Sequence, residues 1–80
     1  MSNFEDYFDT NIAKQVRKFR LIADLTQEEL SLLLNKNIKY IGHIERGERK
    51  ISRKGQMEIM DFLKIQPSDF YNFDDEYIWE

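Results

Sequence analysis

The spacing of apolar residues predicts short helices along the middle of the chain. Ile12, Val16, Phe19 and Ala23 follow one another at steps of four, three and four, the spacing that places side chains on one face of a helix. A first helix is therefore expected from about Asn11 to Ala23. No segment shows the sustained alternation of a half-buried strand, so the fold is expected to be all-α.

The second predicted helix has a clear start signal. Thr26 is followed three residues later by Glu29, which is the pattern of a capping box at a helix N-terminus. The helix is expected to cover residues 27–34. Its expected buried residues are Leu30, Leu33 and Leu34.

A break and a third helix follow at once. Residues 35–37 are Asn-Lys-Asn, and asparagine tolerates the left-handed backbone that a tight interhelical turn requires. Asn37 can also cap a third helix over residues 38–45, and Gly47 is a typical residue just beyond a helix end. The expected inward residues of this helix are Ile41 and Ile44.

Two more helices complete the predicted fold. Ser52 can cap a fourth helix, and Pro67 both ends that stretch and starts a short fifth helix. The expected core residues of these two helices are Ile59, Met60, Leu63, Phe70 and Tyr71. The pattern predicts a compact five-helix domain.

Length and composition limit the possible functions. Eighty residues suffice for one small domain, the chain has no cysteine, and it has one histidine. Disulfides and most structural zinc sites are thus excluded, and no apolar run approaches the roughly 20 residues of a membrane span. A cytoplasmic protein without a cofactor or metal is expected.

The charge of the chain is strongly segregated. The net charge of −3 divides into −3 for residues 1–10, +6 for residues 11–54 and −6 for residues 55–80. A basic segment inside an acidic protein is typical of a local nucleic-acid-binding surface. We expect folding to gather the cations around one helix, with the acidic residues elsewhere.

Residues 27–46 contain two helices joined by a turn of three to four residues, the arrangement of a helix-turn-helix. The segments Thr26-Gln27-Glu28-Glu29-Leu30, Leu34-Asn35 and Ile41-Gly42-His43-Ile44-Glu45-Arg46-Gly47 are similar to the T-Q-E-E-L-A…L-G…I-S-x-I-E-x-G pattern of the lambda-repressor/Cro family, also known as XRE regulators. The resemblance continues to Phe70 and covers residues 11–71. It implies a compact lambda-repressor-like domain that binds double-stranded DNA.

The resemblance also implies roles for individual residues. The groove-facing positions of the recognition helix correspond to Ile38, Lys39, Gly42 and His43. Lysine can donate to guanine O6 and N7, and isoleucine can contact a thymine methyl group. The positions that contact backbone phosphates correspond to Gln27, Tyr40, Arg46, Lys50 and Arg53, and those of a structural ion pair to Arg20 and Glu45.

The two ends of the chain are acidic and aromatic. Residues 1–10 are expected to form an N-terminal extension and residues 72–80 a C-terminal tail; Phe4 and Phe8 have helical spacing, so helical extensions are also possible. Apolar residues in a tail are expected to pack against another surface, either within the same chain or on a partner. The residues expected to support a homodimer are Phe70, Phe73, Tyr77, Ile78 and Trp79.

These observations favour a non-enzymatic regulator, a repressor or autoregulator that binds an inverted-repeat operator as a dimer. The alternative is a protein-binding module of the same fold, such as an antitoxin or an accessory subunit. An enzyme is disfavoured, because the chain has no cysteine, a single histidine and no glycine-rich phosphate loop.

Overall fold

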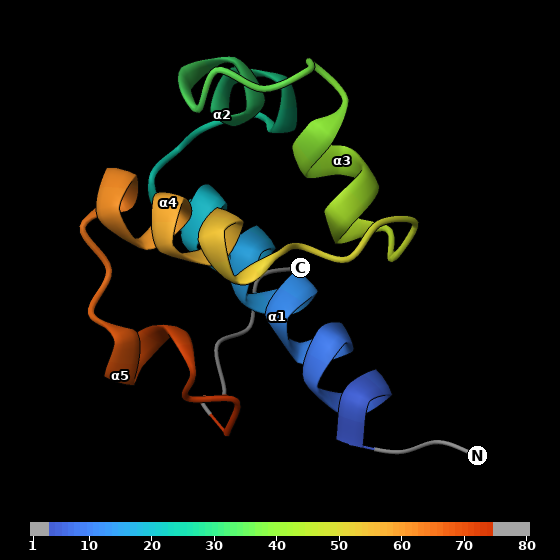
Figure 1. Ribbon diagram of the computed structural model, residues 1–80. Helices are drawn as coiled ribbons and strands as arrows, with labels where there is room; N and C mark the ends of the chain where they lie inside the picture. The colour runs from blue at the N-terminus through green and yellow to red at the C-terminus, as the bar shows by residue number, and fades with distance from the viewer. Residues whose placement is uncertain (1–3, 75–80) are drawn as a thin grey trace.

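The computed structural model describes residues 4–74, and within this range it contains five α-helices and no strand. The helices are α1 (Phe4–Ile22), α2 (Gln27–Leu33), α3 (Tyr40–Glu45), α4 (Arg53–Leu63) and α5 (Pro67–Phe70). Helices α2 and α3 pack on each other, while α3 and α4 both pack on α1 (Figure 1). The prediction of an all-α, five-helix fold is confirmed.

One apolar core joins all five helices. It contains Ile12, Val16, Leu30, Tyr40, Ile41, Ile44, Ile59, Met60 and Phe70. Burying one large aliphatic or aromatic side chain contributes about 1.5–3 kcal/mol, so this cluster supplies most of the favourable energy of folding. Phe70, the last residue of α5, is completely buried and secures the C-terminal end of the domain.

Local signals correctly predicted where α2 begins. The Thr26 hydroxyl accepts a hydrogen bond from the Glu29 N–H at 2.9 Å, and a Glu29 carboxylate oxygen accepts one from the Thr26 N–H at 2.9 Å. Both halves of the predicted capping box are therefore present. They satisfy two N–H groups that a helix start would otherwise leave without partners.

The predicted buried face of α2 is wrong at Leu33, which is 51% exposed. The inward side of this short helix contains Leu30 and Ser31 instead, with Leu34 partly buried at its end. Leu33 lies two positions, or about 200°, from Ser31 around the helix. The apolar periodicity predicted that Leu33 is buried, but in the structure Ser31 faces the core and Leu33 is exposed.

The turn between α2 and α3 uses asparagine as predicted. Asn35 has φ 63°, in the left-handed region, and the Asn37 side chain accepts a hydrogen bond from the Lys39 N–H at 2.8 Å. Helix α3 starts at Tyr40 rather than Ile38. Ile38 and Lys39 therefore belong to the turn that leads into α3.

Helix α1 starts at Phe4, seven residues before the expected start at Asn11. The ring centroids of Tyr7 and Phe8 lie 6.1 and 5.6 Å from that of Phe73, and Phe8 also stacks on Tyr71 at 6.2 Å. Contacts with residues near the other end of the chain thus support the additional helical turns. At the opposite end, Ala23 lies beyond α1 and is exposed, so its expected place in the buried stripe is wrong.

Tyr71 also differs from its prediction. It was expected in the core, but it is partly exposed, and its hydroxyl donates to the Gln56 side chain at 2.6 Å. Gln15 of α1 donates to the Phe70 carbonyl oxygen at 2.8 Å. These polar contacts attach the chain after α5 to α1 and α4.

Candidate nucleic-acid interface

A buried ion pair fixes the orientation of α3 relative to α1. The Arg20 Nε atom lies 2.7 Å from Glu45 Oε2, and the two side chains are only 7% and 3% exposed. A second bond joins Arg20 Nη2 to Glu45 Oε1 at 3.0 Å, so the contact is bidentate. Gln27 adds a 2.9 Å bond from its amide to Glu45 Oε1, and one carboxylate thereby connects α1, α2 and α3.

Ser31 makes a contact that sequence reasoning missed. Its hydroxyl donates to the Gln27 carbonyl oxygen at 2.8 Å and accepts from the Ile41 N–H at 2.9 Å. Ile41 lies in the first turn of α3, where backbone N–H groups lack partners within the helix. A polar residue inside the apolar pattern of α2 was the available signal for this cross-helix bond.

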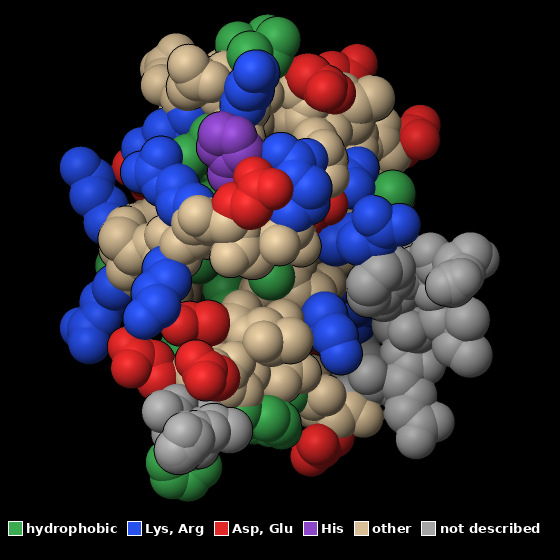
Figure 2. Space-filling model, turned by 90° about the vertical axis from the view of Figure 1, so that its right-hand side faces the viewer, with side chains coloured by type: hydrophobic (Ala, Val, Ile, Leu, Met, Phe, Trp, Pro, Cys, Tyr) green, Lys and Arg blue, Asp and Glu red, His purple; other side chains and the backbone are tan. Residues whose placement is uncertain are grey.

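Polar side chains lie along the outer side of α3. Lys39, His43 and Arg46 are separated by four and three residues, which places them in a row along one side of a helix, and Lys39 and Arg46 are exposed. Figure 2 shows His43, the single histidine of the chain, between Lys and Arg side chains. Ile38 is 46% exposed beside Lys39. Three of the four predicted base-contacting residues are therefore accessible.

Gly42, the fourth, is buried. A Cβ atom at this position would lie 3.0 Å from both Arg46 Nη1 and Gln27 Oε1, so these two side chains lie across the glycine. In the free protein Gly42 is therefore covered by side chains rather than open at the surface, and its predicted contact with a base stays a prediction. The missing side chain leaves room for Gln27 and Arg46 to lie close to the backbone of α3.

Tyr40 was expected to contact a backbone phosphate, and in the free protein it is a core residue with 6% exposure. Burial raises the pKa of its hydroxyl, and the nearby cations Lys36 and Arg49 partly oppose that rise. The Arg49 guanidinium lies 4.9 Å and the Lys36 ammonium 5.5 Å from the ring centroid. The Tyr40 ring therefore lies beneath two cations of the basic segment.

Glu48 introduces a negative charge beside His43 and Arg46 on the outer side of α3. Its carboxylate lies 3.3 Å from Arg46 Nε and 3.8 Å from His43 Nε2, and an acidic side chain is visible directly beside the histidine in Figure 2. All three side chains are substantially exposed. The expectation that the acids lie elsewhere is thus wrong at this position.

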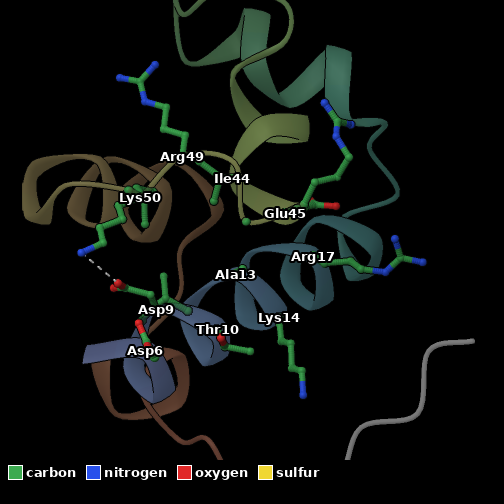
Figure 3. Close-up of a pocket in the computed structure, with 14 residues that line it drawn as sticks. Asp6, Asp9, Thr10, Ala13, Lys14, Arg17, Ile44, Glu45, Arg49 and Lys50 are labelled. Carbon is green, nitrogen blue, oxygen red and sulfur yellow. Dashed lines mark ion pairs between the residues drawn. The ribbon is translucent and has the colours of Figure 1, made fainter. Parts of the chain in front are cut away.

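Lys50 is also paired with carboxylates. Its Nζ atom lies 2.8 Å from Glu5 Oε2 and 3.4 Å from Asp9 Oδ2, and both acids belong to the first turns of α1. The hydrogen bond and the charge of Lys50 lower the pKa of Glu5, and the two carboxylates raise the pKa of Lys50. Figure 3 shows the Lys50 side chain reaching towards Asp9. Arg53, at the start of α4, is exposed.

A cleft of about 450 Å³ separates the first half of α1 from the loop between α3 and α4. Asp6 and Asp9 line its α1 side, whereas Arg49 and Lys50 line its loop side. In Figure 3 the Arg49 and Lys14 side chains point away from the cleft. Lys14 and Arg17 also line the α1 side, so this side carries both charges, and Lys50 of the loop pairs with Asp9 of α1.

Comparison with known proteins identifies the central part of the chain. A sequence model described as helix-turn-helix matches residues 16–70, which is more than half of the chain and extends from within α1 to the end of α5. Neither the curated proteins nor the solved structures contain a match. Among the helices of residues 4–74, none has the length and apolar composition of a membrane-spanning segment.

Proposed function

The chain belongs to the helix-turn-helix family of DNA-binding regulators, of the lambda-repressor/Cro (XRE) type, and on this premise we propose that it is a repressor or autoregulator that recognises a specific operator. The observation that carries the proposal is the buried contact of Glu45 with Arg20 and Gln27. It holds α3 rigidly while the outer side of the helix stays accessible. Rigid presentation of a short helix is what reading the major groove requires.

Individual roles in this proposal follow from exposure and chemistry. Lys39 and Ile38 precede the first turn of α3 and are exposed, so they contact base edges, the lysine at guanine and the isoleucine at a thymine methyl. His43 contacts a base or a neighbouring phosphate. Arg46 and Arg53 bind phosphates, which set the register of the protein on DNA without reading the sequence.

Gln27 and Lys50 have other partners in the free protein. The Gln27 amide donates a hydrogen bond to Glu45. The main role of Gln27 in this proposal is therefore to position α3, and contact with a phosphate is secondary. Lys50 must leave Glu5 and Asp9 before it can pair with a phosphate. These two residues therefore contribute less to binding than their position in the sequence implies.

The test of the proposal separates base contacts from phosphate contacts. Operator sequences are selected from random duplexes at physiological salt, and Lys39→Ala is compared with Arg53→Ala on an operator and on a random duplex. Lys39→Ala should cost about 1–3 kcal/mol on the operator and much less on random DNA. Arg53→Ala should weaken both complexes alike and reduce the salt slope by about one. Equal losses from both variants on both duplexes would contradict these roles.

We further propose that two copies bind the two halves of an inverted repeat about one helical turn apart, because a single small module makes few contacts with DNA. Phe70 cannot take part in the interface, since it is completely buried. Phe73 is partly buried against Tyr7 and Phe8, and Tyr77, Ile78 and Trp79 lie outside the described residues. Tyr7 and Phe8, whose rings contact Phe73, are themselves exposed.

Sedimentation with and without operator DNA tests the dimer. The apparent mass should rise with protein concentration, and an operator with two half-sites should bind two copies cooperatively. A duplex with one half-site is the control, and it should bind one copy much more weakly. A protein that remains monomeric at hundreds of micromolar, and binds the full operator one copy at a time without cooperativity, would reject the dimer.

A further inference from the structure

The first turns of α1 lie outside the part of the chain that the family model matches. Helix α1 begins at Phe4, whereas the match begins at residue 16. Residues 4–10 contain Glu5, Asp6 and Asp9 and no basic residue. This chain therefore adds an acidic helical segment, residues 4–10, to the DNA-binding fold.

The acidic segment contacts the loop that follows the recognition helix. Glu5 and Asp9 are separated by four residues, so they lie on the same side of α1, and both reach the Lys50 ammonium, at 2.8 and 3.4 Å. Lys50 is separated from Glu5 by 45 residues in the sequence. The contact is thus a product of folding, and it pairs a cation of the basic segment before any DNA arrives.

Aromatic contacts hold this segment in position in addition to the ion pairs. Tyr7 and Phe8 lie on the side that packs against Phe73, and Phe8 also stacks on Tyr71. Tyr71 is itself bonded to Gln56 of α4. Loss of the Lys50 contact would therefore leave the acidic segment where it is, close to any phosphate that Lys50 then binds.

We propose that residues 4–10 act as a built-in competitor of DNA, in which Glu5 and Asp9 take the place of a backbone phosphate on Lys50 and lower the affinity for all duplexes. This proposal rests on the proposed function. Two effects work in the same direction. Lys50 must leave two carboxylates to bind a phosphate, and those carboxylates then repel DNA within the Debye length of about 10 Å at 0.1 M salt.

The competitor also changes the response to salt. When Lys50 moves to a phosphate, counterions leave the DNA, but the vacated carboxylates take up cations from solution. The two exchanges offset each other, so the phosphate contact of Lys50 adds little to the salt slope. Without the acids the same contact should steepen the slope by about one.

The experiment is a double-mutant cycle read out as binding to a random duplex across a salt series. The variants are Glu5→Gln with Asp9→Asn, Lys50→Met, and all three substitutions together. Glu5 is an exposed partner of Lys50, whereas Asp9 is partly buried with its Oδ2 atom out of contact with solvent, and Gln and Asn keep the size of the side chains. The charge-matched control is Asp61→Asn with Asp69→Asn, which removes two exposed carboxylates from α4 and α5.

The acid-to-amide pair should tighten binding roughly three- to tenfold at low salt, in line with the modest strength of exposed ion pairs. In the Lys50→Met background the part of the gain that comes from competition for Lys50 should vanish, and only the smaller part that comes from relieved repulsion should remain. The control pair should tighten binding clearly less than the acid-to-amide pair does in the wild type. An equal gain with and without Lys50, a gain no larger than that of the control, or no gain would overturn the proposal. Failure of the wild type and of every variant to bind any duplex would instead reject the proposed function.

Discussion

Glu45→Ala should lower the free energy of unfolding by about 3–5 kcal/mol, because it leaves the buried Arg20 guanidinium without its carboxylate. The Arg20 side chain is 7% exposed, so water cannot replace the lost partner. An 80-residue domain has a total stability of roughly 4–12 kcal/mol. The variant should therefore melt about 12 °C or more below the wild type, or fail to fold, in a thermal denaturation followed by circular dichroism.

Glu48→Ala is the matched control for this prediction. It removes the same type of side chain three residues later, but Glu48 is exposed together with its partner Arg46, and exposed pairs contribute at most about 1 kcal/mol. The combined variant Arg20→Met with Glu45→Leu should recover much of the loss, because it removes both buried charges and fills the space. Similar losses of unfolding free energy for Glu45→Ala and Glu48→Ala would show that burial of the Arg20–Glu45 pair does not increase its contribution to stability.

The fold was predictable wherever a few neighbouring residues determine the backbone. The capping box of Thr26 and Glu29, the left-handed Asn35 and the terminal Gly47 all act within four residues of their own position. Their chemistry is the same in an isolated peptide and in the folded domain. These signals mark the start of α2, the turn between α2 and α3, and the end of α3.

Side-chain burial was less predictable, because it depends on residues far away in the sequence. Gly42 is buried because Gln27 and Arg46 extend across it, and Tyr40 is buried in a core shared with α1 and α4. A helical repeat identifies one side of a helix but not what will cover it. For this reason two of the residues expected to contact DNA are buried in the free protein.

The early start of α1 and the pairing of Lys50 have the same origin. The aromatic contacts that support the segment join residues 7 and 8 to residues 71 and 73, and the ion pair spans 45 positions. Charges summed by segment separate the acidic N-terminus from the basic middle, although folding brings them together. The segregation of charge in the sequence therefore overstates the positive potential of the surface.

Phe70→Ala should be about as damaging as Glu45→Ala, with a loss of about 3–5 kcal/mol, the usual cost of deleting a fully buried phenylalanine. Phe70 is 0% exposed, and its ring centroid lies 6.2 Å from that of Phe19 and 5.2 Å from that of Tyr71. Alanine would leave a cavity beneath α5, and the segment after α5, which supports the first turns of α1, would lose its anchor. Urea denaturation would measure the loss.

Phe62→Ala is the control for the same deletion at a site that is 41% exposed, and it should cost much less, since little apolar surface leaves the core. The comparison also separates two roles for Phe70. If Phe70 stabilises the core of a single copy, Phe70→Ala should lower the free energy of unfolding by the same amount at low and at high protein concentration. A loss that grows with protein concentration, with the stability of the monomer unchanged, would assign Phe70 to an interface between copies and contradict its place in the core.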